Sequence, residues 1–175
     1  MQILLIRHAR AQERRAKRPD AERALTSEGR ERLLECRAGL AALEYAPTRI
    51  LHSPWLRAAQ TAALLAAQDA NGDASVDVPV DVHAGLARAP DAALAAELAA
   101  RGEGSLWCVG HEPWLSELAC VLVGLPAKSA GAIALKKCGV LVLERDGDDS
   151  NDAWKIAAQL PPRVLRRLGA NAQPA

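Results

Sequence analysis

The sequence is poor in aromatic residues and has almost no excess of charge. Its 175 residues include no phenylalanine and one tyrosine, beside four tryptophans, and the net charge at pH 7 is +1. Proteins that bind nucleic acids usually carry a strong basic excess and stack aromatic side chains on bases. The composition therefore argues against a nucleic-acid partner. It predicts a core of Leu, Val, Ile and Ala packed around a few tryptophans.

Two further absences bear on the location of the protein. No apolar run approaches the ~20 residues of a membrane span, and the apolar run at residues 3–6 is too short for a secretory signal. The four cysteines show no Cys-x-x-Cys spacing, so we expect reduced thiols rather than disulfides or a zinc site. These patterns predict a cytoplasmic protein with no membrane partner.

Short apolar strands alternate with helical segments along the chain, which is typical of a mostly parallel sheet with helices on both faces. The expected strands are residues 3–6, 49–52, 76–82, 105–109, 133–135 with 140–143 (one interrupted strand or two), and 154–160. Pro79 places the third of these at a sheet edge. We find no repeat and no dividing linker. We therefore expect a single domain over residues 1–168, followed by a mobile tail at 169–175.

The helix starts carry recognisable signals. Thr26 or Ser27 can cap a helix whose apolar face includes Leu33, Cys36, Leu40 and Leu43. Ser53 is predicted to cap the next helix, with Pro54 at its first position. The apolar face expected for that helix is Leu56, Gln60, Ala63, Leu64 and Ala67.

Three strand-to-helix junctions carry residues suited to bind an anion. Arg7 and His8 end the first strand, Arg57 lies in the first turn of the second helix, and His111 follows the strand over 105–109. Ligands of open α/β sheets bind beyond the carboxyl ends of the strands, so a parallel sheet would bring these side chains together. Two arginines, two imidazoles and two helix N-termini predict a pocket for a dianionic phosphoryl group.

Two histidines in one anion site permit covalent catalysis. A neutral His8, its tautomer fixed by a backbone carbonyl, would attack phosphorus, while Arg7, Arg57 and His111 would neutralise the equatorial oxygens. These steps need no metal and no cofactor. Each residue taken singly is more often structural, so the hypothesis depends on their order and their shared position at strand ends.

Other residues near these junctions are weaker candidates for contact with substrate. Residues 10–23 hold an excess of Arg and Lys, which we interpret as a solvated loop and as a basic rim that attracts an anion towards His8. The candidates for substrate binding are Arg10, His83, Asp91 and Glu112. We expect His52 to pack beneath the pocket, and Lys136 and Lys137 to form a solvated strand edge.

Four motifs in this order resemble the histidine phosphatase (phosphoglycerate mutase-like) superfamily. They are Ile6-Arg7-His8-Ala9, Leu25-Thr26-Ser27-Glu28-Gly29, the run from Ser53 to Ala62, and Val109-Gly110-His111-Glu112-Pro113. The short chain is most similar to the SixA-type phosphohistidine phosphatases. The resemblance implies a three-layer α/β/α sandwich with one antiparallel strand in its sheet. It also implies that His8 is the phosphorylated nucleophile and that Arg7, Arg57 and His111 bind phosphate.

The sequence departs from the larger family members in one respect. Those members carry a glutamate general acid in the loop after the third strand, and residues 85–91 hold none. Asp91 is the nearest carboxylate, and Glu13, Asp20 and Glu112 are other candidate donors, but for each we favour solvation or helix capping. SixA-type proteins also tend to lack this acid, and the labile P–N bond of phosphohistidine needs it less than an alkyl ester does.

The leading hypothesis is a cofactor-independent phosphatase that acts through phospho-His8 on phosphohistidine in a protein. The alternatives are a phosphatase of small phosphorylated metabolites, a non-catalytic phosphate-binding module, and a metal-dependent hydrolase using His8, His111 and a carboxylate. The flanking arginines argue against a cation at this site, so no metal is expected. No interface stripe stands out, and we expect a monomer.

Overall fold

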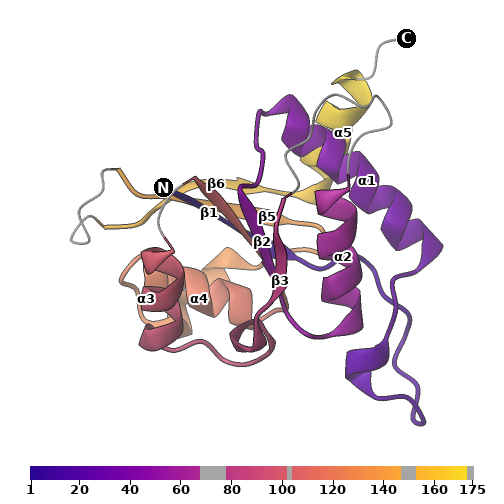
Figure 1. Cartoon of the computed structure of the whole chain (residues 1–175), viewed down its shortest axis with the longest axis horizontal. Coiled ribbons are helices and arrows are strands. Elements are labelled where there is room, and N and C mark those ends of the chain that lie inside the picture. The colour runs from indigo at the N-terminus through magenta and orange to yellow at the C-terminus, as the bar shows by residue number, and fades with distance from the viewer. Residues whose placement is uncertain (68–77, 102–103, 147–152, 173–175) are drawn as a thin grey trace.

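The computed structural model describes residues 1–67, 78–101, 104–146 and 153–172. Six strands in these residues form one sheet, in the order β3-β2-β4-β1-β5-β6 (Figure 1). The strands are β1 (Gln2–Arg7), β2 (Arg49–His52), β3 (Val80–Val82), β4 (Ser105–Gly110), β5 (Val140–Glu144) and β6 (Lys155–Leu160). Only β5 runs antiparallel to its neighbours, β1 and β6. The mostly parallel sheet with one antiparallel strand is therefore confirmed.

Helices cover both faces of this sheet, which makes three layers (Figure 1). One face is covered by α1 (Ser27–Ala42), α2 (Leu56–Ala66) and α5 (Pro162–Ala172). The other face is covered by α3 (Ala92–Ala100), α4 (Trp114–Leu122) and the 3-10 helices η2 (Ala84–Ala87) and η3 (Ala127–Ile133). A further 3-10 helix, η1 (Asp20–Glu22), lies in the loop after β1. The expected α/β/α sandwich is confirmed.

Strand β1 lies inside the sheet and supplies side chains to both cores. Ile3 and Leu5 pack into the core under α3 and α4, while Leu4 and Ile6 pack into the core under α1, α2 and α5. All four are at most 1% exposed. Burying one such side chain stabilises the fold by about 1.5–3 kcal/mol, so the strand that ends in Arg7 is held firmly on both faces.

Helix α1 begins as expected, because the Thr26 side chain accepts a hydrogen bond from the Gly29 backbone N at 3.0 Å. Its buried face includes Leu33, Cys36 and Leu40, but Leu43 is 37% exposed. The helix packs against α5 through Gly39, where a Cβ atom would lie 2.0 Å from the Leu165 carbonyl oxygen.

The expected tail at residues 169–175 is wrong in its first part. Helix α5 extends to Ala172, and Gly169 packs closely on α1. A close backbone contact at a glycine leaves no apolar pattern in the sequence, so the sequence does not show that residues 169–172 are packed.

The start and the buried face of α2 also differ from expectation. The helix begins at Leu56 with Trp55 as its N-cap, so Ser53 and Pro54 precede it. Its buried residues are Arg57, Ala58, Thr61, Ala62 and Leu65. The helix is turned so that Arg57 points inward to make polar contacts. An apolar periodicity cannot predict a face that is defined by a buried guanidinium.

Residues 133–135 do not form a strand. Ile133 ends η3, and β5 begins only at Val140. The backbone groups of Leu135 bond to side chains instead of a neighbouring strand: its carbonyl accepts from Arg7 and its N donates to Glu112.

The edge position of β3 is confirmed, although the strand spans only Val80–Val82. The start of the predicted strand, at residues 76–77, lies outside the described residues. Among the described residues, no single helix is long and apolar enough to cross a membrane. The pair α4 and η3, bent by 113°, meets that test only when the two are taken together.

Candidate active site

The register of the central strands brings the predicted residues together. Arg7 of β1 lies opposite Gly110 of β4, so the next residues of the two strands, His8 and His111, are neighbours. Their ring centroids are 5.0 Å apart, and the His8 backbone N donates to Gly110 O at 3.1 Å. Both imidazoles are buried, as is Arg57 at the start of α2. The structure thus places Arg7, His8, Arg57 and His111 together at the carboxyl ends of the parallel strands, as the sequence predicts.

The hydrogen bonds of His8 define its tautomer. Its Nδ1 lies 2.7 Å from the Ala9 carbonyl oxygen, which can only accept, so Nδ1 carries the hydrogen. Its Nε2 accepts a hydrogen bond from Arg57 Nε at 3.1 Å. Burial lowers the pKa of His8 to about 3, opposed by the Ala9 carbonyl and reinforced by the charges of Arg57, Arg7 and Lys137. The ring is therefore neutral at physiological pH, with its lone pair on Nε2.

His111 is held by Ser53 and by aromatic contacts. The Ser53 hydroxyl accepts from the Trp55 backbone N at 3.3 Å and lies 2.8 Å from His111 Nε2. A hydroxyl can accept two hydrogen bonds and donate one, so this contact fits either tautomer of His111; when Ser53 donates to Nε2, the ring hydrogen lies on Nδ1. Trp55 packs on the ring with a centroid distance of 4.3 Å. Burial and the neighbouring His8 and Arg57 lower the pKa of His111 to about 3, so this ring is also neutral.

The two arginines are anchored at one end of each guanidinium. Arg7 Nη1 donates to the Leu135 carbonyl at 2.6 Å. Arg57 donates from Nη1 to the Asp20 carbonyl at 2.6 Å and from Nη2 to the Asp20 carboxylate at 3.0 Å, and it stacks on Trp55. These bonds fix both cations at the His8 ring.

Two buried nitrogen atoms in this pocket have no hydrogen-bond partner. In the described residues, three buried side-chain polar atoms lack a hydrogen bond, and two of them are Arg7 Nε and His111 Nδ1. Buried polar groups in native proteins are nearly always hydrogen-bonded. Arg7 Nε is a donor, and His111 Nδ1 is a donor in the tautomer in which Ser53 donates to Nε2, so the pair fits a site that binds the oxygens of an anion.

The comparisons with known proteins agree with this geometry. Residues 3–87 match the family model of the Histidine phosphatase superfamily (branch 1), and those residues include Arg7, His8 and Arg57. Over these residues the chain resembles the histidine phosphatase superfamily. No significant sequence match was found among curated proteins.

Solved structures of histidine phosphatases share the fold over almost the whole chain. The protein histidine phosphatase SixA complexed with tungstate has a TM-score of 0.75 at 24% identity, covering 94% of this chain and 99% of that one. A protein of Agrobacterium tumefaciens assigned as a phosphohistidine phosphatase SixA has a TM-score of 0.70 at 25% identity, covering 92% and 97%. The phosphoserine phosphatase of Entamoeba histolytica, in complex with 3-phosphoglyceric acid, has a TM-score of 0.68 at 15% identity, covering 94% and 98%.

Among the four candidate proton donors, only the side chain of Asp20 bonds to one of the four pocket residues, Arg57. Burial tends to raise the pKa of its carboxyl group, but the hydrogen bond from Arg23 and the charge of Arg57 outweigh burial and lower the pKa to about 2. Asp20 is therefore ionised at neutral pH. In this arrangement it orients Arg57 and holds no proton to donate.

The other carboxylates have structural partners. Asp91 caps α3 by accepting from Leu94 N at 2.8 Å, as the sequence suggests. Glu112 accepts from Leu135 N at 2.8 Å and from the Ser116 hydroxyl at 2.7 Å, so it ties the loop after β4 to the segment that holds Arg7. Glu13 is exposed.

Three basic candidates likewise bond elsewhere. Arg10 pairs with Glu28, and His83 lies 3.0 Å from Glu97 while its Nδ1 accepts from the Gly85 backbone N. His52 is buried at the end of β2 as expected, with its Nδ1 2.8 Å from the Ser53 carbonyl. None of these contacts joins the three side chains to the four pocket residues.

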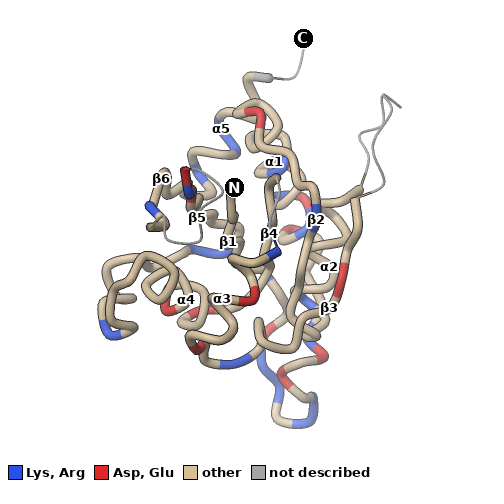
Figure 2. Tube along the Cα trace, turned by 60° about the vertical axis from the view of Figure 1, so that its left-hand side comes forward, with Lys and Arg blue, Asp and Glu red and all other residues tan. Residues whose placement is uncertain are grey.

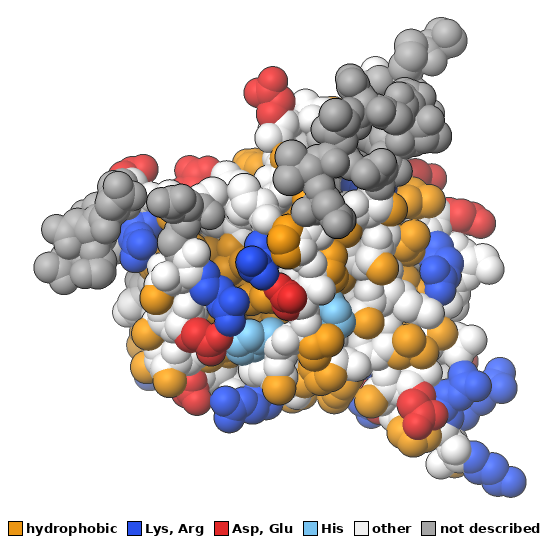
Figure 3. Space-filling view, viewed as in Figure 1, with side chains coloured by type: hydrophobic (Ala, Val, Ile, Leu, Met, Phe, Trp, Pro, Cys, Tyr) orange, Lys and Arg blue, Asp and Glu red, His pale blue; other side chains and the backbone are white. Residues whose placement is uncertain are grey.

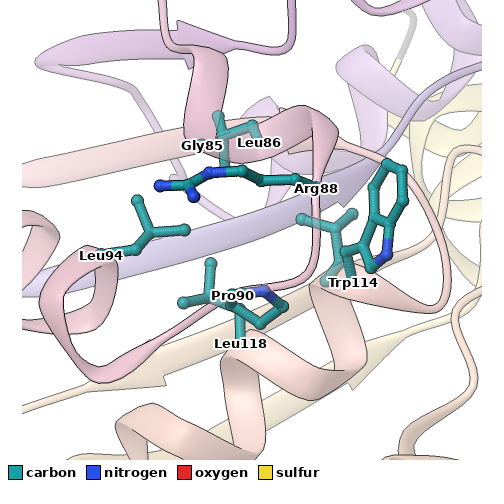
Figure 4. A pocket seen from close by; sticks show the side chains of 8 residues that line it. Gly85, Leu86, Arg88, Pro90, Leu94, Trp114 and Leu118 are labelled. Atoms are coloured by element: carbon teal, nitrogen blue, oxygen red, sulfur yellow. The ribbon is translucent and has the colours of Figure 1, made fainter.

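The loop after β3 lines a separate shallow hollow beside the pocket. This hollow lies between the loop and α4 (Figure 4). Figure 4 shows Trp114 at one side of it and Arg88 above it, with Pro90 and Leu94 completing the wall. Trp114 also packs edge-on against His111 at 6.1 Å. The side of the pocket where larger members place an acid is thus apolar here, except for Arg88.

Sequence reasoning missed three residues around the pocket. Ser53 orients His111, although it was interpreted only as a helix cap. The Thr61 hydroxyl accepts from Ala9 N at 3.1 Å and so fixes the carbonyl that orients His8; Thr61 lies in the Ser53–Ala62 motif, which was a usable signal. Lys137 was expected at a solvated strand edge, but it lies in a turn and its charge acts on His8.

Proposed function

We propose that this protein is a phosphatase that transfers a phosphoryl group to His8 and then to water, with phosphohistidine in a protein as its substrate. The observation that carries the proposal is a neutral His8, its lone pair on Nε2, in one pocket with Arg7 Nε and His111 Nδ1, which are buried without a hydrogen-bond partner. The proposal assigns the ring hydrogen of His111 to Nδ1. A nucleophile and an oxyanion pocket in contact are what phosphoryl transfer requires.

The reaction is written in two displacements. His8 Nε2 attacks phosphorus and forms a P–N bond, while the P–N bond to the leaving imidazole breaks and that nitrogen takes up a proton from solvent water. The later hydrolysis of phospho-His8 returns one proton to the solvent. Arg57 gives up its hydrogen bond to Nε2 and turns this donor towards a phosphoryl oxygen, beside Arg7 and His111. Water then attacks phospho-His8, the second P–N bond breaks, and phosphate leaves with His8 neutral again.

The preference for phosphohistidine is supported by two observations. The loop after β3 presents no carboxylate to the hollow beside His111, and the P–N bond of phosphohistidine needs an acid less than an alkyl ester does. SixA structures also stand among the similar folds. A phosphatase of small metabolites is the second candidate, because an alpha-ribazole-5'-P phosphatase of Escherichia coli shares the fold with a TM-score of 0.69 at 16% identity, covering 93% of this chain and 97% of that one.

No cofactor forms part of the proposal. Among the described residues no group of three or more His, Cys, Asp or Glu is placed to hold a metal ion, and the flanking arginines disfavour a cation. We further propose a cytoplasmic monomer. The four cysteines are free and buried, which suits a reducing compartment.

A panel of substrates tests the proposal. We expect a higher kcat/KM on a phosphohistidine protein than on sugar phosphates and other alkyl phosphates. Replacing His8 with Ala should reduce kcat/KM by about 10³-fold or more, since removing a covalent nucleophile removes the first step. A higher kcat/KM on the alkyl esters would favour the metabolite phosphatase, and unchanged turnover in His8→Ala would refute the nucleophile.

A further inference from the structure

The segment over residues 135–139 is tied to the phosphate pocket by hydrogen bonds to one residue. Arg7 donates from its backbone N to Gly139 O at 3.1 Å, and its carbonyl accepts from Cys138 N at 3.0 Å. Arg7 Nη1 donates to Leu135 O at 2.6 Å. The segment therefore lies directly beside the residue that precedes the proposed nucleophile.

Lys137 occupies a tight turn within this segment. The Gly139 backbone N donates to the Lys136 carbonyl at 2.7 Å, which closes the turn, and Cys138 has a positive φ of 61°. These bonds fix the backbone of Lys137, while its side chain is exposed and free to reach a ligand.

The ammonium group of Lys137 lies among other cations. Burial first, and then the charges of four arginines, lower the pKa of Lys137. These arginines are Arg7, Arg10, Arg23 and Arg57. The hydrogen bonds between Arg7 and residues 135–139 place the backbone of Lys137 beside the pocket, and the charge of Lys137 also lowers the pKa of His8.

Carboxylates offset only part of this positive charge. Asp20 pairs with Arg23 and Arg57, and Glu28 pairs with Arg10. In the part of the chain that the structure describes, Lys137 makes no hydrogen bond or ion pair. Lys137 and the four arginines thus carry five positive charges against the two negative charges of Asp20 and Glu28. A bound phosphoryl dianion would still leave a net positive charge.

We propose that Lys137 binds a carboxylate that the substrate carries next to its phosphoryl group. Arg7, His8, Arg57 and His111 already supply the contacts to the phosphoryl group, so a fifth cation at the pocket edge is left for a second anionic group. This inference rests on the proposed function, and for a protein substrate it means an Asp or Glu beside the phosphohistidine.

Binding of two small phosphonates tests this subsite without requiring turnover. Methylphosphonate offers a phosphoryl-like group alone, and phosphonoacetate adds a carboxylate. By calorimetry we expect the wild type to bind phosphonoacetate about tenfold more tightly than methylphosphonate, the gain of one charge-assisted hydrogen bond. In Lys137→Met this preference should disappear, with the affinity for methylphosphonate within about twofold of the wild type.

The neighbouring lysine supplies the matched control. Lys136→Met removes the same charge from the same turn and should keep the preference for phosphonoacetate. Equal affinities for the two phosphonates in the wild type would overturn the proposal, as would a preference that survives Lys137→Met. An equal loss of both ligands in that variant would also overturn it, because Lys137 would then contact the phosphoryl group.

Substrate peptides identify the source of the carboxylate. Two phosphohistidine peptides that differ only by Glu or Gln next to the phosphohistidine should differ several-fold in KM for the wild type, with the same kcat, and should not differ for Lys137→Met. A preference seen with the phosphonates but not with the peptides supports the subsite and assigns the carboxylate to a small phosphorylated acid. If no substrate is turned over, the proposed function fails, while the phosphonate result still decides the subsite.

Discussion

At the scale of single residues, the pocket depends on the hydrogen bonds that define two imidazole tautomers. The Ala9 carbonyl leaves His8 Nε2 without a hydrogen, and a hydrogen bond donated by the Ser53 hydroxyl to His111 Nε2 would leave one on His111 Nδ1. In the proposed reaction the first ring is the nucleophile and the second is a donor. Moving the hydrogen to the other nitrogen of His8 or His111 would remove the proposed role of that ring, because a neutral imidazole has one donor and one acceptor nitrogen.

Titration of the two rings tests this description. Because burial lowers both pKa values to about 3, nitrogen NMR of the ring-labelled protein should show His8 and His111 neutral from pH 8 down to pH 4.5. In denaturant both rings should titrate near the ordinary value of about 6.5. A folded-state pKa within one unit of 6.5 for either ring would contradict the account.

Substitution of Ser53 tests the orientation of His111. Ser53→Ala removes the bond to Nε2, frees the tautomer and should reduce kcat/KM by about tenfold, the effect of one lost hydrogen bond. Ser53→Thr keeps the hydroxyl and should restore most of the rate. Ser27→Ala, at an exposed position, is the control. If Ser53→Ala reacts like that control, Ser53 does not position His111.

At the scale of elements, the sequence predicts what lies at strand ends better than what lies on helix faces. β1 and β4 were predictable because a buried apolar run has one interpretation, and the pairing of His8 with His111 follows from their parallel register. The buried face of α2 was not predictable. The face includes the charged Arg57, and the alanines of α2 can lie on a buried or an exposed face.

The contact between α1 and α5 gives a prediction at this scale. A Cβ atom on Gly39 would lie 2.0 Å from the Leu165 carbonyl oxygen, and backbone cannot move aside as a side chain can. Gly39→Ala should therefore reduce the free energy of unfolding by about 1–3 kcal/mol, the usual cost of overpacking. Chemical denaturation measures it.

Gly131→Ala is the matched control for that substitution. Nothing lies within 4 Å of a Cβ atom at Gly131, so its stability should change little. Equal stabilities of the two variants would show that α1 and α5 do not depend on this close approach.

At the scale of the whole molecule, side chains from distant parts of the sequence meet at the carboxyl ends of the parallel strands. Lys and Arg are frequent in the loop after β1, which projects from the body of the protein (Figures 2 and 3). The basic rim was predictable from composition. The position of residues 135–139 beside the pocket was not, because it depends on β5 lying antiparallel to β1 and on three hydrogen bonds to Arg7.

The buried histidines also make global stability depend on pH. His8 and His111 have pKa values of about 3 in the folded state and about 6.5 when unfolded. Between these values the unfolded chain binds more protons, so stability rises with pH and is lost as the pH falls below 6.5. Each ring should contribute a slope of about 1.4 kcal/mol per pH unit.

Denaturation of the wild type and of His8→Ala between pH 4.5 and 6 measures this dependence. Asp20 contributes little in that window, because its folded pKa of about 2 matters only below the ordinary value of 3.8. The variant should lose about half of the slope. A slope unaffected by the substitution would mean that His8 is not buried as a neutral ring.

The central claim is that Nε2 of His8 receives the phosphoryl group. The most direct measurement is to trap the phosphoenzyme with a phosphohistidine donor, then map the modified residue by mass spectrometry and its ring position by NMR. The account predicts phosphate on Nε2 of His8, since Nδ1 carries a hydrogen bonded to the Ala9 carbonyl. Phosphate on Nδ1 of His8, on another residue, or on none during turnover would contradict it.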